Sequence, residues 1–103
     1  RWNPEDMLLA SISACHKLWY LHFCAVNNIL VQEYRDEAIA IMDEGSSGHA
    51  GRFISATLKP RVRISSESDA VKALALHENA HRACFIANSL NFPVKCEALI
   101  EKD

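Results

Sequence analysis

The first element that the apolar pattern predicts is a long helix whose apolar residues cover nearly the whole circumference. It runs from Pro4 to about Val26, with Asn3 as a suitable N-cap and proline at the first helical position. Glu5 and Asp6 follow, where the helix dipole favours negative charge. Because a helix that is apolar all round is buried on all sides, we expect this one to be central. A small domain has little surface with which to cover it, so we expect a homodimer.

Alternating apolar residues then predict two strands. The first spans about Val31 to Met42 and the second about Arg52 to Ile64. The segment between them, Asp43–Gly51, contains all three glycines of the chain and is predicted to be a flexible loop. Pro60 lacks an N–H group, so it marks a bulge or an edge position. The two strands are therefore expected to form a hairpin.

A second helix is predicted after the polar segment SSESD, with Ser66 or Ser68 as its N-cap and its end near Asn88. One face of this helix carries small and apolar side chains, two histidines and a cysteine. These are Ala70, Ala73, Leu74, His77, Ala80, His81 and Cys84. The segment Asn91–Ile100 is predicted to be a closing strand. The order of elements predicts one α+β domain over residues 1–103, with two main helices packed on a β-sheet.

Composition narrows the classes of function. The formal net charge is −2, which gives no support to a nucleic-acid-binding surface. His16, Lys17 and His22 interrupt the long helix, so it is expected to be a buried helix rather than a membrane span. The four cysteines lie far apart with no C-x-x-C pair. We therefore expect reduced thiols and a cytoplasmic protein, with neither nucleic acid nor membrane as a partner.

The second helix contains the motif H-E-x-x-H as His77, Glu78 and His81. On a helix this spacing places two imidazoles on one face, as in zinc proteases. A zinc protease needs a third protein ligand, and in the longer motif that ligand would fall at Ala87, which cannot bind metal. We expect the histidines to cap, pack or hydrogen-bond, with no metal and no cofactor. The alternatives are a zinc site or metalloprotease at His77, Glu78 and His81, and a metal site built from His77, His81 and Cys84.

The cysteines differ in context. Cys24 and Cys96 are interpreted as small buried apolar side chains, the usual role of a lone cysteine. Cys15 lies in the middle of the first helix, and Cys84 lies near the end of the second, three residues after His81. Cysteines on two packed helices can approach each other, and spacing alone leaves this open.

Two motifs resemble those of a known family. The segment NPEDMLLASISAC, Asn3–Cys15, closely resembles the N-P-E-x-L-x-x-A-x-x-x-x-C signature of the OsmC/Ohr family of osmotically inducible and organic hydroperoxide resistance proteins. Met7 replaces the usual leucine. The segment AHRAC, Ala80–Cys84, matches the family's A-H-x-x-C helix. The resemblance extends from Asn3 to about Ile100, and it implies an intertwined homodimer with active sites at the subunit interface.

The resemblance also implies a thiol-dependent peroxidase that reduces organic hydroperoxides. Cys15 would be the peroxidatic cysteine, which forms a sulfenic acid. Cys84 would be the resolving cysteine, which gives a Cys15–Cys84 disulfide. Glu5 would help to hold a catalytic arginine. A dithiol, typically on a lipoylated protein, would reduce the disulfide.

The chain departs from the family pattern at two places. The family arginine comes from a segment upstream of N-P-E, and only Arg1 and Trp2 precede that motif in the printed sequence. We therefore expect the printed domain to lack an N-terminal β segment. After Cys84 the chain reads CFIANS, where the family often reads C-P-x-S.

The apolar residues near Cys15 bear on the choice of substrate. Ile12, Leu18 and Trp19 are the predicted substrate-binding residues, and their apolar character favours organic over small polar peroxides. The alternative within the family is a non-enzymatic protein that binds a small apolar ligand or acts in stress.

Overall fold

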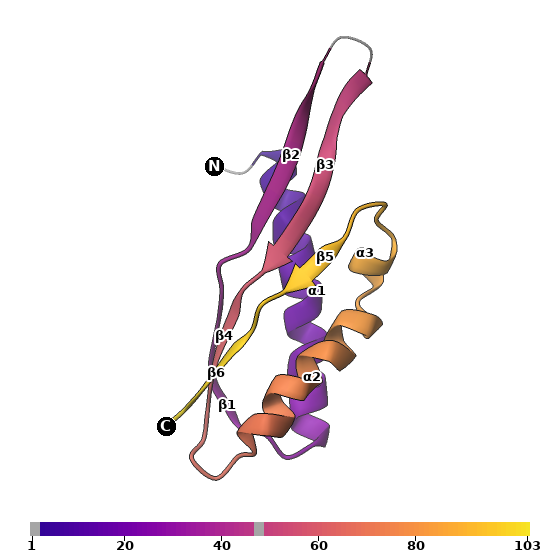
Figure 1. Ribbon diagram of the computed structural model, residues 1–103. Coiled ribbons are helices and arrows are strands. Elements are labelled where there is room, and N and C mark those ends of the chain that lie inside the picture. Colours follow the sequence, from indigo (N-terminus) through magenta and orange to yellow (C-terminus); the bar gives the residue numbers. More distant parts are fainter. Residues whose placement is uncertain (1–2, 47–48) are drawn as a thin grey trace.

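The computed structural model describes residues 3–46 and 49–103, and these form an α+β fold with helices packed against two small sheets (Figure 1). In chain order the elements are α1 (Pro4–Val26), β1 (Val31–Asp36), β2 (Ile39–Ser46), β3 (His49–Leu58), β4 (Pro60–Ile64), α2 (Ala70–Ala83), α3 (Phe85–Asn88), β5 (Val94–Cys96) and β6 (Leu99–Lys102). The predicted class, two main helices with β-structure, is confirmed.

The strands form two three-stranded sheets with the orders β1-β4-β6 and β2-β3-β5. β1 is antiparallel to β4 and β2 is antiparallel to β3, so the predicted hairpin is confirmed. β5 and β6 then join β3 and β4 in parallel. Figure 1 shows the β2–β3 ribbon above and the β1-β4-β6 sheet below it, with α1 running along both.

Each of the two predicted strands is interrupted once, the first at residues 37–38 and the second at Lys59. Beside these interruptions, one Asp36 carboxylate oxygen accepts a hydrogen bond from the backbone N–H of Lys59 at 2.7 Å. The other accepts the hydroxyl of Ser13 from α1. Pro60 begins β4, a position where its missing N–H breaks no ladder. The Asp36 carboxylate thus connects the interrupted strands to α1 by hydrogen bonds.

The predicted loop over Asp43–Gly51 is mostly wrong, because β2 and β3 extend into it and only residues 47–48, outside the described part of the chain, separate them. The glycines serve the ribbon itself. Gly45 has a φ of +94°, which favours glycine. A Cβ on Gly51 would lie 2.9 Å from the carbonyl oxygen of Asp43, so the two strands approach too closely there for a side chain.

α1 has the predicted bounds, and Asn3 caps it by accepting the backbone N–H of Asp6 at 2.7 Å. In the single chain α1 is not buried on all sides, contrary to the prediction. One line of side chains is buried, while Leu18 and Val26 on other faces are 70% and 62% exposed. The buried line consists of Ile12, His16, Tyr20 and Cys24. Among the described residues, no helix is long and apolar enough to cross a membrane.

The core has two parts, one for each sheet. In the first, Ile12 of α1 packs on the β2-β3-β5 sheet. In the second, Tyr20 and Cys24 pack on β4 and α2. The buried members of the first part are Ile12, Ala56, Leu58 and Val94. Those of the second are Tyr20, Cys24, Ile29, Val62, Ile64, Ala73, Leu76 and Ala80.

α2 differs from the prediction at both ends. Its N-cap is Asp69, which accepts the backbone N–H of Lys72, rather than Ser66 or Ser68. Ser68 is buried and instead accepts the backbone N–H of Leu30, so its hydroxyl serves a tertiary contact. The helix does not continue to Asn88. It stops at Ala83 because the next residue, Cys84, has an extended backbone with φ −69° and ψ 109°, and the short α3 follows.

The buried Tyr20 hydroxyl donates to the carbonyl oxygen of Ala73 at 2.8 Å and so connects α1 to α2. We expect Tyr20→Phe to lower the free energy of unfolding by about 1–2 kcal/mol, measured by urea denaturation. Tyr34→Phe is the matched control, because the buried Tyr34 hydroxyl has no hydrogen-bond partner among the described residues. We expect this control to be neutral or slightly stabilising, and equal losses in both variants would contradict the assignment.

Candidate functional site

Cys15 and Cys84 meet where α1 passes the end of α2. Cys15 lies in the middle of α1 and is half-buried, whereas Cys84 is 1% exposed at the break between α2 and α3. The Cys15 thiol lies close enough to Cys84 to help raise the pKa of that thiol. Both cysteines are free in the structure. The approach that sequence spacing left open is therefore present in the fold.

Cys84 lies in a protected environment. Its sulfur caps α3 by accepting the backbone N–H of Ala87 at 3.5 Å. The pKa of the Cys84 thiol is raised to about 11, mainly by burial; the backbone N–H of Ala87 opposes this shift and the neighbouring Cys15 thiol adds to it. At neutral pH this cysteine therefore holds its proton, and only its thiolate is a nucleophile.

Glu5 does not reach the cysteine pair within one chain. It precedes Cys15 by ten positions on α1, which corresponds to about 15 Å along the helix axis. It lines a separate cleft of about 420 Å³ together with Arg52 of β3. The single chain thus separates the acidic residue of the N-terminal signature from its cysteine.

The three predicted substrate-binding residues have different environments. Ile12 is 1% exposed and belongs to the core beneath the β2-β3-β5 sheet. Leu18 is exposed. Trp19 is half-buried and meets the ring of Phe85 edge-on, with ring centroids 5.7 Å apart. Phe85 directly follows Cys84 in the chain. Of the three predicted substrate-binding residues, Trp19 is therefore the one with a contact next to the cysteine pair.

The histidines of the H-E-x-x-H motif do not form a shared metal site. His77 is buried and points toward α1, whereas Glu78 is exposed and His81 is half-buried. Among the described residues, one group of side chains has possible metal-ligand atoms close together, and Glu78, His81 and Cys84 do not belong to it. Both alternatives, the zinc site at His77, Glu78 and His81 and the site at His77, His81 and Cys84, therefore lack support in the geometry.

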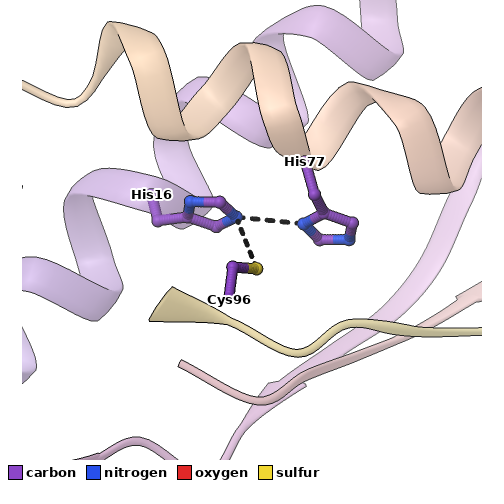
Figure 2. Close-up of side chains that lie close together, drawn as sticks. All are labelled: His16, His77 and Cys96. Atoms are coloured by element: carbon purple, nitrogen blue, oxygen red, sulfur yellow. Dashed lines mark hydrogen bonds between the residues drawn. The ribbon is translucent and has the colours of Figure 1, made fainter. Parts of the chain in front are cut away.

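His77 instead joins two residues from other elements. His16 Nε2 of α1 lies 3.0 Å from His77 Nδ1 of α2 and 3.8 Å from Cys96 Sγ of β5 (Figure 2). The three potential ligand atoms all lie within 4.8 Å of one another. The His77 ring also stacks on Tyr20 with centroids 3.8 Å apart. The cluster of His16, His77 and Cys96 is thus the group in the described residues that could hold a metal ion.

Burial keeps this cluster uncharged. It lowers the pKa of His16 from 6.5 to about 4, although Asp36 raises it and His81 lowers it. Burial, together with a smaller effect of His16, lowers the pKa of His77 to about 3. Burial also raises the pKa of the Cys96 thiol to about 11. At neutral pH both imidazoles are neutral and each retains a lone pair on one nitrogen.

His16 and Cys96 are not among the predicted site residues, and Cys96 is predicted to be a small buried apolar side chain. A signal was present for His16, which lies four residues after Ile12 and four before Tyr20, on the buried line of α1. A histidine at a core position requires a polar partner. No comparable signal in the sequence marks Cys96, because its approach to the two histidines depends on β5 pairing with β3.

The buried pair should make stability depend on pH. The folded state keeps His16 and His77 neutral, with pKa values near 4 and 3, while unfolded histidine binds a proton near pH 6.5. Stability is therefore fully present above pH 6.5 and falls as the pH drops toward 4, by up to about 1.4 kcal/mol per pH unit for each histidine. The measurement is urea denaturation at several pH values in metal-free buffer.

In the same experiment His77→Gln should make stability depend less on pH. His22→Gln, which replaces an exposed histidine on α1, is the control that tests whether the effect belongs to the buried pair. A wild-type slope in His77→Gln would argue against the assignment.

Comparison with known proteins connects the fold to a family. The model described as OsmC-like protein matches residues 1–98. An OsmC-like protein of unknown function from Vibrio cholerae is 34% identical, with a TM-score of 0.83, and the match covers 93% of this chain. The chain spans 63% of the length of that protein. A comparison with curated proteins gave no significant match.

Two other solved structures carry functional names. The organic hydroperoxide resistance protein OhrB of Bacillus subtilis is 25% identical, with a TM-score of 0.73, and the match covers 94% of this chain and 70% of that one. An organic hydroperoxide resistance protein from Legionella pneumophila shares the fold at 18% identity, with a TM-score of 0.72, over 96% of this chain and 69% of that one. The family match over nearly the whole sequence confirms the resemblance seen in the two motifs, and the chain belongs to the OsmC family of OsmC-like proteins.

Proposed function

We propose that this chain is a thiol-dependent peroxidase that reduces organic hydroperoxides. The observation that carries the proposal is the proximity of the thiols of Cys15 and Cys84, on helices that the fold packs together. Membership of the OsmC family supports it, as does similarity to a protein named for organic hydroperoxide resistance.

The proposed reaction has two oxidative steps. The Cys15 thiolate attacks the terminal oxygen of the hydroperoxide, the O–O bond breaks, and the alcohol leaves with a proton while Cys15 becomes a sulfenic acid. The Cys84 thiol then gives up its proton as its sulfur attacks the Cys15 sulfur, the S–O bond breaks, and the hydroxyl group leaves with that proton as water while the disulfide forms. An external dithiol, which we propose to be a lipoylated protein, reduces the disulfide and is itself oxidised to a disulfide.

The roles of the two cysteines follow from their burial. Cys15 is the more accessible and so is suited to meet the peroxide first. Burial raises the pKa of Cys84, which disfavours its thiolate and so disfavours Cys84 as the thiol that attacks the peroxide. The proximity of the two thiols favours formation of the disulfide between them.

The surface beside Cys15 suits an apolar peroxide. Leu18 and Trp19 lie three and four residues after Cys15, on the same side of α1. The Phe85 ring, which contacts Trp19, is 71% exposed. These side chains would contact the organic group of the substrate, and burial of apolar surface would contribute to its binding.

We further propose that the active protein is a homodimer and that the site is completed at the subunit interface. Because Glu5 lies about 15 Å along α1 from Cys15, it would act with an arginine at the Cys15 thiol of the other subunit. The shape of the chain supports association. Its radius of gyration is 15.3 Å, against about 13 Å for a compact domain of this length. Large apolar side chains also remain exposed on α1 and β2.

The central experiment is intact-mass measurement of the reduced protein after one equivalent of cumene hydroperoxide. We expect the wild type to lose two hydrogen atoms as the disulfide forms. Cys15→Ser should abolish peroxide consumption, while Cys84→Ser should still react and leave a sulfenic acid on Cys15 that dimedone traps. Cys24→Ser, which removes a buried cysteine of the same helix, is the matched control and should behave as the wild type.

A wild type that consumes no peroxide would contradict the peroxidase proposal. If a small apolar molecule then stabilised Cys15→Ser and wild type equally, the non-enzymatic ligand-binding alternative would replace it.

The dimer can be tested separately by size-exclusion chromatography with light scattering. The expected mass is twice the chain mass of 11.5 kDa. Ile41→Lys introduces a charge on the exposed apolar side of β2 and should weaken dimerisation at least tenfold, whereas Glu37→Lys, at an exposed polar position just before β2, should not. A monomer at micromolar concentrations would contradict this part of the proposal.

A further inference from the structure

The cluster of His16, His77 and Cys96 is not used by the proposed peroxidase reaction. Its members come from α1, α2 and β5, and Figure 2 shows the three side chains pointing toward one another. We propose that this cluster binds a zinc ion, with His16 Nε2, His77 Nδ1 and Cys96 Sγ as ligands, and that the ion fastens the two helices to β5. The proposal concerns atoms outside the Cys15–Cys84 pair and goes beyond the peroxidase function.

The separations between the ligand atoms suit a tetrahedral ion. With Zn–N bonds of about 2.0 Å and Zn–S bonds of about 2.3 Å, tetrahedral ligands lie roughly 3.3 Å apart for two nitrogens and 3.6 Å apart for nitrogen and sulfur. The observed distances are 3.0 Å between His16 Nε2 and His77 Nδ1, and 3.8 Å between His16 Nε2 and Cys96 Sγ. The separation between His77 Nδ1 and Cys96 Sγ is at most 4.8 Å, so a bound ion would draw these two atoms together while the other two pairs shift by a few tenths of an ångström.

The contact between the two histidines places two possible ligand atoms next to each other. His16 Nε2 and His77 Nδ1 lie 3.0 Å apart, and in the neutral pair one of these nitrogens donates its proton to the lone pair of the other. Both rings are buried, with His16 1% and His77 4% exposed. A cation between the rings would accept a lone pair from each of these nitrogens, and the ring proton of each histidine would then lie on its other nitrogen.

The charges around the cluster favour a cation. Asp36, Glu78 and Glu97 all act electrostatically on the Cys96 sulfur, and Asp36 also acts on His16. A divalent ion in this field offsets the cost of removing the thiol proton, which binding requires. A cleft of about 510 Å³ reaches His77 and Cys96, and Glu78 and Glu97 line it. The cleft provides an entry path, and a water molecule in it can supply the fourth ligand.

The ligand set selects the class of metal. Two imidazoles and one thiolate suit zinc and other borderline first-row ions, whereas magnesium and calcium prefer oxygen ligands. The ligands come from distant parts of the chain, so a bound ion would affect the stability of the fold. His16 and Cys96 are 80 residues apart, so a single ion would close a long loop of the chain and stabilise the folded state alone.

The test uses Cys15→Ser/Cys84→Ser protein, in which the thiols of the proposed redox pair cannot bind metal or oxidise. The protein is stripped with a chelator, dialysed and titrated with Zn²⁺ and with Co²⁺. We expect one ion per chain and, for Co²⁺, the near-ultraviolet charge-transfer band of a thiolate–cobalt bond. Zinc at about a hundredfold excess over Kd should raise Tm by roughly 10 °C.

Ligand variants are made on the same background. Cys96→Ser should remove the charge-transfer band and weaken zinc binding at least a hundredfold, and His77→Gln should weaken it similarly. Cys24→Ser and His22→Gln are the matched controls, one buried cysteine and one exposed histidine of α1, and both should bind like the parent.

The titration of the parent protein decides the proposal even if a ligand variant fails to fold. Absence of stoichiometric uptake, or a cobalt complex without the thiolate band, would overturn it. Folded Cys96→Ser that binds zinc as tightly as its parent would overturn it as well. Because the parent already lacks the redox pair, each of these results is independent of whether the wild type reduces peroxides.

Discussion

One line of side chains on α1, spaced by four residues, makes contact with every layer of the molecule. Ile12 packs on the β2-β3-β5 sheet, and Tyr20 and Cys24 pack on β4 and α2. His16 lies between these apolar groups and meets a histidine of α2. Apolar burial supplies most of the stabilisation but is not directional, whereas the hydrogen bonds of His16 and Tyr20 fix how the helices are oriented. Since Cys15 adjoins this line, the position of the proposed reacting thiol depends on the same contacts.

Much of the fold could be predicted because it follows from local patterns. The bounds of α1 follow from its capping residues and its apolar content, and the β2–β3 hairpin follows from alternation. The interruptions of the strands could not be predicted, because they depend on the Asp36 carboxylate, which bonds to Lys59 and Ser13 far away in sequence. The cap of α2 was misassigned because Ser68 is held by Leu30, a tertiary contact that overrides its capping propensity.

The candidate site was predictable to a similar extent. Cys15 and Cys84 stand in motifs that identify them one by one, and their contact then depends only on two helices packing. The histidine cluster was missed because it needs three elements and a parallel strand pairing at once. The H-E-x-x-H spacing was misleading for a related reason. A helix places His77 and His81 on one side, but their partners decide their roles, and it is His77 that meets His16 of α1.

The order of the strands has a consequence for the nascent chain on the ribosome. β3 and β4 are the central strands of their sheets, yet β5 and β6, which complete them, come last in the described sequence. Until residues 94–102 emerge, each central strand exposes one open edge of N–H and C=O groups to other chains. Synthesis of this segment therefore closes both sheets at once and brings Cys96 beside the histidines of α1 and α2, which are made earlier.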